Sequence, residues 1–216
     1  MKSTFLCFFY IAIFYCFAIS CKKKDNQEQV TFPQTIYSHD VSVTSAVRMF
    51  TSDGEIKDTT LINSYIRGMH YFNLTSVDPS DYLSFISADS VIISSYTDKF
   101  SYTLNNGLFL LYSRNYYQFD PSDHLSRLCD TILKYKAPKV MVPAGTNLLN
   151  WARKAIWVAH GSYRELSCAG LGYKVSTSWG YHAGTLPNEF FEDSTAALRQ
   201  GDTIAVQSYV LHMVAK

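Results

Sequence analysis

Histidine, serine and aspartate side chains supply most nucleophilic and acid–base catalysis, and their spacing in this chain is irregular. The six histidines are scattered over 216 residues, and none lies four residues from another. His160 stands near Ser162, and Asp123 precedes His124, but neither pair has a third group at a defined spacing. No GxSxG elbow, HExxH helix, P-loop or GxGxxG is present. The sequence therefore predicts no catalytic residue, metal site or cofactor, and favours a protein that is not an enzyme.

Aromatic side chains offer a different chemistry, because their faces stack on sugars and their bodies line apolar cavities. Trp151 and Trp157 lie in a β-like segment, Tyr173 follows them, and Trp179 and Tyr181 belong to the loop-like stretch SWGYHAG. Binding residues often sit on loops. These five are the candidate binding aromatics, although core packing is the commoner use of such residues in a β domain.

Five cysteines are present, of which Cys7 and Cys16 lie in an apolar N-terminal run. No CxxC pair or cysteine–histidine spacing indicates zinc. In an oxidising compartment Cys129 and Cys168 could form a disulfide. The alternative is two separate buried thiols, since free cysteine packs as a small hydrophobe.

The N-terminal segment predicts where in the cell the protein is located. Lys2 is followed by an apolar run, Phe5 to Ile19, of the length of a signal-peptide core. Ala18-Ile19-Ser20-Cys21 resembles the bacterial lipobox, in which the cysteine is lipidated and becomes the new N-terminus. A plain cleaved signal and an uncleaved anchor are the alternatives.

This resemblance implies a Gram-negative bacterial lipoprotein. Residues 1–20 would be the signal peptide, residues 21–34 the lipidated Cys21 and a polar tether, and residues 35–216 one globular domain. Lys22 in second place is similar to lipoproteins that pass to the outer membrane. We therefore expect a lipid-anchored protein of the cell envelope that faces the periplasm or the cell surface.

Charge argues against nucleic acid as a partner. The chain has 19 basic and 18 acidic side chains, and loss of residues 1–20 removes only Lys2 among them. With no basic excess there is little to neutralise phosphates. The apolar fraction of 47% argues against disorder and for a domain with a real core.

Hydrophobic periodicity predicts the elements. Residues 41–51 alternate as one half-buried strand, and Leu61, Ile62, Tyr65, Ile66 and Met69 form a helical stripe after an N-cap at Asp58 or Thr59. Asn106-Gly107 predicts a hairpin turn. The segments 154–160, 163–169 and 171–178 read as three strands separated by Gly161 and Gly170. A short helix over 194–200, ended by Gly201, precedes a closing strand over 202–216.

The tetrapeptide DPSD occurs twice, at residues 78–81 and 120–123. Paired acids could bind calcium, but Asp-Pro-Ser-Asp is also a helix start or tight turn, which we prefer because further oxygen ligands are lacking. Together the short strands predict a mainly β fold, a single antiparallel β-sandwich or barrel with two or three short helices.

A second resemblance concerns residues 150–173. Trp151, Gly161, Leu166 and Tyr173 fall at intervals similar to those of the macrolide-binding (immunophilin) peptidyl-prolyl isomerases. This resemblance implies, as an alternative, an α+β half-barrel in the C-terminal part and an envelope folding factor. Lys174 stands where that class has glycine after the tyrosine.

We therefore expect a membrane-anchored lipoprotein, held through lipid on Cys21, that acts as a ligand-binding or structural module. Its partner would be a glycan, an apolar ligand or another envelope protein. A binding role predicts an aromatic-lined cavity, whereas an assembly role predicts a large exposed apolar patch.

Overall fold

The structure is a computed structural model, and it describes residues 30–94, 99–105, 107–118, 122–143, 149–160, 163–175 and 182–216. Backbone alone is described at residues 105, 125, 126, 129 and 182–186. The expected signal peptide, Cys21 and most of the tether lie outside these ranges, as do Trp179 and Tyr181.

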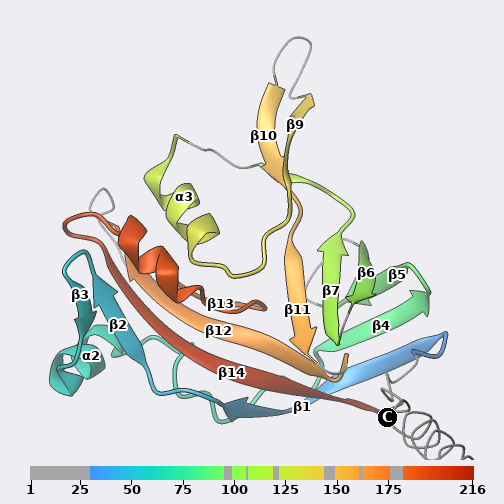
Figure 1. Cartoon of the computed structure of the whole chain (residues 1–216). Helices are drawn as coiled ribbons and strands as arrows, with labels where there is room; N and C mark the ends of the chain where they lie inside the picture. Colours follow the sequence, from blue (N-terminus) through green and yellow to red (C-terminus); the bar gives the residue numbers. More distant parts are fainter. Residues whose placement is uncertain are drawn as a thin grey trace, which may run out of the picture.

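Eight antiparallel strands close into a barrel (Figure 1). Around the barrel the order is β12-β11-β7-β6-β5-β4-β1-β14, and β14 pairs with β12 to close it. Their bounds are β1 Gln34–Val43, β4 Tyr82–Ser87, β5 Ser90–Ile93, β6 Lys99–Asn105, β7 Leu108–Ser113, β11 Ile156–His160, β12 Glu165–Lys174 and β14 Thr203–Ala215. The prediction of a mainly β barrel with few helices is confirmed.

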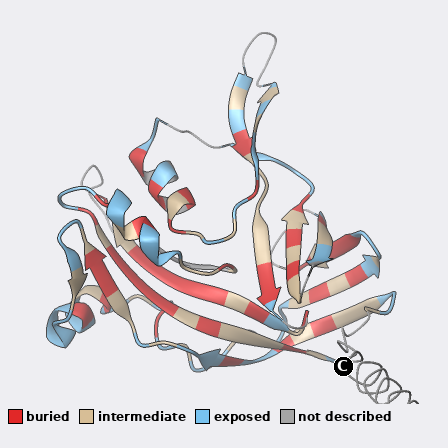
Figure 2. Cartoon of the chain, viewed as in Figure 1, coloured by how far each residue is buried: buried red, intermediate tan, exposed pale blue. Residues whose placement is uncertain are grey.

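The barrel interior is filled by large side chains from alternate strand positions, as a period of two requires. In β7, for example, Phe109 and Leu111 are buried while Leu110 and Tyr112 are only half-buried. Phe85 and Phe100 are fully buried in the same core, and Tyr102 stacks on Phe109 with ring centroids 4.9 Å apart. Figure 2 shows buried and less buried residues alternating along barrel strands.

Two strands run on beyond the barrel. β12 and β14 have 10 and 13 residues, and their far halves continue into a sheet with β13 His182–Leu186, β2 Arg48–Thr51 and β3 Gly54–Ile56. Helix α2 Thr59–Ile66 packs on the face that continues the barrel interior, against Met49 and Ala205. Helix α3 His124–Thr131 and the 3-10 helix η1 Glu192–Ala197 lie on the other face, where Leu171 and Val206 are buried.

A second, three-stranded sheet projects from the barrel (Figure 1). Its order is β8-β10-β9, with bounds β8 Tyr117–Gln118, β9 Lys139–Pro143 and β10 Leu149–Arg153. We call β9 and β10 the arm. The arm leads directly into β11, so its base lies at one end of the barrel.

Several local predictions are confirmed. The Asp58 side chain accepts hydrogen bonds from the Thr60 and Leu61 amides and caps α2. β6 and β7 pair up to Asn105 and Leu108, with Gly107 at φ 76°, as the Asn-Gly turn predicts. β14 spans nearly all of the predicted closing strand.

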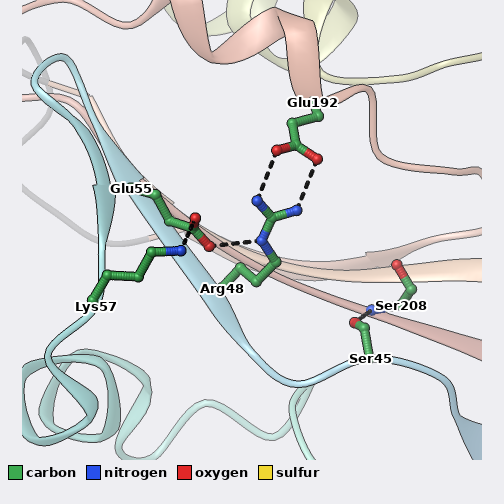
Figure 3. Close-up of polar contacts among 6 residues, drawn as sticks. All are labelled: Ser45, Arg48, Glu55, Lys57, Glu192 and Ser208. Atoms are coloured by element: carbon green, nitrogen blue, oxygen red, sulfur yellow. Dashed lines mark hydrogen bonds and ion pairs between the residues drawn. The ribbon is translucent and has the colours of Figure 1, made fainter.

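Two local predictions are wrong. Residues 41–51 are not one strand, because β1 and β2 pair with different halves of β14. Between them the Thr44 and Ser45 amides both donate to the Ser208 carbonyl, and the Ser208 amide donates to the Ser45 hydroxyl (Figure 3). Nor does Gly170 separate two strands, since β12 runs through it without a break.

Candidate functional site

The larger of two neighbouring cavities lies at the barrel, under the loop that follows α2. Its volume is about 500 Å³. The wall is mostly apolar, and four side chains add polar groups. The apolar lining is Leu74, Val77, Trp157, Cys168, Pro187, Tyr209 and Leu211, and the polar lining is Ser38, Ser76, Asp78 and Asp81. The volume and the mixture match what small-molecule sites generally show.

The loop between α2 and β4, residues 67–81, forms one side of this cavity, and a buried amide fixes it. Gln207 of β14 is only 2% exposed. Its carbonyl oxygen accepts from the Asn73 amide at 2.6 Å, and its NH2 group donates to the Ser45 carbonyl and the Asn73 side chain, each at 3.1 Å. Because a buried amide left unpaired is costly, this pairing specifies where the loop sits.

Two glycines let the loop approach the sheet. A Cβ on Gly170 would lie 2.2 Å from the Tyr71 carbonyl oxygen, and one on Gly172 would lie 2.6 Å from the Met69 sulfur. Both residues are on the face of β12 that continues the barrel interior, opposite Gln207 and Ala205. A glycine inside a strand often marks such a close backbone approach, and here it brings the loop over the barrel end.

Asp78 and Asp81 give the larger cavity its negative charge. The Ser80 hydroxyl and amide both donate to the Asp78 carboxylate, which lowers the pKa of Asp78 below its usual value. Asp81 accepts from the Ser94 hydroxyl at 3.0 Å, and its carbonyl accepts from the Ser38 amide at 2.8 Å. The first DPSD segment is therefore a tight turn, as predicted, and it contributes two acidic residues to the lining of the cavity. No lysine or arginine is among the described residues that line it.

The smaller cavity lies at the base of the arm and has a volume of about 200 Å³. Trp157 and Pro187 line both cavities. The remaining wall is aromatic, aliphatic and basic, and the described lining includes no carboxylate. It consists of Tyr117, Leu133, Tyr135, Lys136, Ala137, Arg153, Lys154, Ala155, Ile156 and Asn188.

Hydrogen bonds hold the walls of the smaller cavity in place. Asn188 is buried, and its side chain accepts from the Tyr135 amide and donates to the Tyr135 carbonyl. The Val158 amide donates to the Pro187 carbonyl at 3.1 Å. Opposite, the Ala155 amide donates to the Ser113 hydroxyl at 2.8 Å. A cavity fixed in this way loses little ordering entropy when a ligand enters.

Trp157 stands between the two cavities. It belongs to β11, opposite Leu111 of β7, and its side chain packs against the barrel core with its ring 6.2 Å from that of Phe100. Its half-buried indole therefore has one part in the core and another in the cavities. Of the five predicted aromatics, it is the only one with a described side chain that lines either of these two cavities.

The other two predicted aromatics with described side chains lie elsewhere. Trp151 is on β10 and 41% exposed, and Tyr173 is on β12 beside the core under α3 and η1. Cys168 is a buried free cysteine whose thiol pKa is raised to about 12 by burial. The Cys129 side chain lies outside the described residues, so its pairing with Cys168 stays a prediction.

The arm carries an exposed apolar face. Met141 and Trp151 are opposite each other in the β9–β10 register, and Leu149 follows on the same side of β10. They are 50%, 41% and 58% exposed. The same face continues through Arg153 and Tyr117, which are also opposite each other, into the smaller cavity.

Polar clusters outside the cavities serve the architecture. Arg48 of β2 donates two hydrogen bonds to Glu192 of η1, at 2.7 and 2.8 Å, and one to Glu55 of β3 (Figure 3). Hydrogen bonds from Arg48 and from Lys57 lower the pKa of Glu55 to about 2, and Arg48 also lowers that of Glu192. This cluster ties η1 to the extended sheet.

Histidines find structural partners. His124, the first residue of α3, is within 2.6 Å of the carboxylate of Asp202, and both are buried. His160 contacts Glu189, which also accepts from Lys134. Burial raises the pKa of Glu189, but the hydrogen bonds from Lys134 and His160 outweigh it, so the pKa is lowered.

Within the described part of the chain, no group of three or more His, Cys, Asp or Glu side chains could hold a metal ion. No helix there has the length and apolar character needed to cross a membrane.

Comparison with known proteins adds no relative: no family model, no curated protein and no solved structure matches the chain.

Sequence reasoning missed most of the cavity. Lys136, Lys154 and Pro187 stand in no motif, and only the DPSD turn could have drawn attention to Asp78 and Asp81. Their position depends on which strands become neighbours, which local patterns do not reveal.

Proposed function

We propose that the protein is a membrane-anchored lipoprotein of the cell envelope whose barrel binds a small, largely apolar ligand. The observation that carries the binding role is the cavity of about 500 Å³ beside Trp157. Leu74, Val77, Tyr209 and Leu211 give it an apolar wall, and burial of apolar ligand surface there would supply the affinity.

The polar groups of this cavity narrow the class of ligand. Asp78 and Asp81 accept hydrogen bonds and, when ionised, repel anions. A ligand with a hydroxyl or amino group at one end and an apolar or aromatic body fits these walls. An anionic group has no counter-charge among the described residues that line this cavity.

A neutral fluorescent naphthylamine, N-phenyl-1-naphthylamine, tests this role. In the full-length chain we expect saturable binding that Leu211→Arg weakens about 10-fold, because the new side chain enters the cavity and meets the two carboxylates. Leu104→Arg is the matched control, since Leu104 is exposed and lines neither cavity. Ser76→Arg, at an exposed loop position in the lining, repeats the test without disturbing the barrel. Equal affinities for all four proteins would refute the proposal.

The anchor rests on the lipobox-like segment before Cys21. Cys21→Ala should abolish labelling with palmitate and release or mislocalise the protein, since several acyl chains hold a protein far more firmly than one. Palmitate labelling of the variant would contradict lipidation at Cys21.

A second candidate function, docking of another envelope protein, is favoured by the arm. Met141, Leu149 and Trp151 form an exposed apolar face, which is the feature that an assembly role predicts. A photoreactive amino acid at position 151 should crosslink one defined partner in intact cells, whereas the same group at exposed Leu104 should not.

A further inference from the structure

The two cavities differ in charge although they share Trp157 and Pro187. Among the described residues, those that line the larger cavity include two acidic and no basic ones, and those that line the smaller include three basic and no acidic ones. An anionic ligand group therefore has one favourable destination in this region, and it is the smaller cavity.

Not all of the three cations are equally available. Arg153 donates to the Asp130 carboxylate, so the positive charge of Arg153 is compensated. Lys139 contacts the same carboxylate at 2.7 Å. Lys134, just outside the lining, is paired with Glu189. Neither Lys136 nor Lys154 has a carboxylate partner among the described residues.

Aromatic rings position both of these lysines without neutralising them. The Lys154 ammonium lies 5.4 Å from the centroid of the Tyr116 ring, and that of Lys136 lies 5.5 Å from the centroid of the Phe191 ring. A cation over a ring face is held in a preferred direction but keeps its full charge. Lys154 is also half-buried, which reduces screening by water of any anion that reaches it.

The rest of the lining suits the body of such a ligand. Tyr117, Tyr135 and Trp157 offer aromatic surface, and Ile156 and Pro187 offer aliphatic surface. The backbone hydrogen bonds at Val158 and Ala155 fix this geometry before a ligand arrives.

We propose that the smaller cavity is an anion-binding subsite, in which Lys136 and Lys154 receive a carboxylate, sulfonate or phosphate group of a ligand whose apolar or aromatic part contacts Trp157. The subsite extends the binding role proposed above. It predicts that the complete ligand is amphiphilic, with its anionic end at the base of the arm.

A matched pair of probes tests the subsite. The anion 8-anilinonaphthalene-1-sulfonate is N-phenyl-1-naphthylamine with one added sulfonate, so the difference between their affinities reports on the charge. In the full-length chain, Lys136→Gln/Lys154→Gln should weaken binding of the sulfonate about 10-fold and change that of the neutral amine by less than about twofold. Added salt should weaken binding of the sulfonate probe and leave binding of the neutral amine unchanged.

Lys216→Gln is the control, because Lys216 also lies over an aromatic ring, that of Tyr37 at 4.3 Å, but lines neither cavity. The apolar segment at residues 5–19 is identical in every variant and contributes equally to any background. Unchanged sulfonate affinity in the double variant, or an equal loss for both probes, would overturn the subsite.

The two proposals can fail separately. If the neutral amine does not bind but the sulfonate binds through the two lysines, the apolar cavity is refuted and the subsite stands. If the amine binds and the affinity for the sulfonate does not depend on the two lysines, the subsite is refuted and the apolar cavity stands.

Discussion

The larger and smaller cavities meet at Trp157, yet their outer walls are built in different ways. The larger one is closed by a loop, residues 67–81, that a buried glutamine and two glycine contacts hold against the barrel. The smaller one is bounded by two short segments that pair through Asn188 and by the strand that leads from the arm into the barrel. The barrel thus supplies the shared apolar surface, while the surrounding segments place acidic residues at one cavity and basic residues at the other.

The largest expected effect on stability comes from substitutions under the loop of residues 67–81, which lines only the larger cavity. Gly170→Ala places a Cβ against the Tyr71 backbone and should destabilise the fold by about 3 kcal/mol, because backbone yields less readily than a side chain. Gly172→Ala meets the end of the flexible Met69 side chain and should cost about 1 kcal/mol. Urea unfolding of both variants measures the difference.

The same pair sharpens the functional contrast. Gly170→Ala displaces the loop that carries Asp78 and Asp81, so the neutral amine should bind less well while the sulfonate is retained. Equal stability of the two glycine variants would show that the loop does not approach β12 as described.

The next effect concerns the surface that both cavities share. Trp157→Ala removes a half-buried ring from beside Phe100 and should cost about 2 kcal/mol, with loss of both probes. Trp151→Ala changes an exposed residue of the arm and should alter stability by less than about 0.5 kcal/mol. Thermal unfolding and probe titration together check this, and a reversed order would place the functional tryptophan on the arm.

The smallest effect is an acid sensitivity of the extended sheet. The pKa of Glu55 is lowered from 4.5 to about 2, so its contribution to stability is present above pH 4.5 and is lost as the pH falls through about 2. Glu192, whose pKa is also lowered by Arg48, acts in the same direction. Glu192→Gln should therefore flatten the loss of stability on acidification.

Asp193→Asn is the control for this measurement, since Asp193 is an exposed acid on the same 3-10 helix and is not part of the Arg48 cluster. Chemical unfolding at a series of pH values gives, for each variant, the slope of the free energy of unfolding against pH. A slope for Glu192→Gln equal to that of the unsubstituted chain would show that the cluster contributes nothing.

Much of the fold was accessible from the sequence. Alternating hydrophobic residues predicted strands, Asp58 or Thr59 predicted the start of α2, and Asn106-Gly107 predicted the β6–β7 turn, because each of these signals is local. Closure was not accessible, since it depends on the pairing of β12 with β14, about forty residues apart in sequence. Gly170 shows most clearly what local patterns miss. A local rule takes a glycine as the end of a strand, whereas here a glycine is needed because the backbone of a distant loop, at Tyr71, lies against the strand.

The candidate site was less accessible than the fold. Aromatic content brought Trp157 into consideration together with Trp151, Tyr173, Trp179 and Tyr181, but nothing local separates a tryptophan at a cavity from one on an exposed arm. The charged residues of the two linings, Asp78 and Asp81 in one and Lys136, Arg153 and Lys154 in the other, come from segments that only the folded barrel brings to the same tryptophan.

A crystal structure of the protein with N-phenyl-1-naphthylamine tests the central proposal most directly. We expect the probe's rings in the larger cavity, against Trp157 and Tyr209 and below the loop of residues 67–81. An empty cavity, with the probe instead on the arm against Met141 and Trp151, would contradict a ligand-binding barrel and assign the function to the arm.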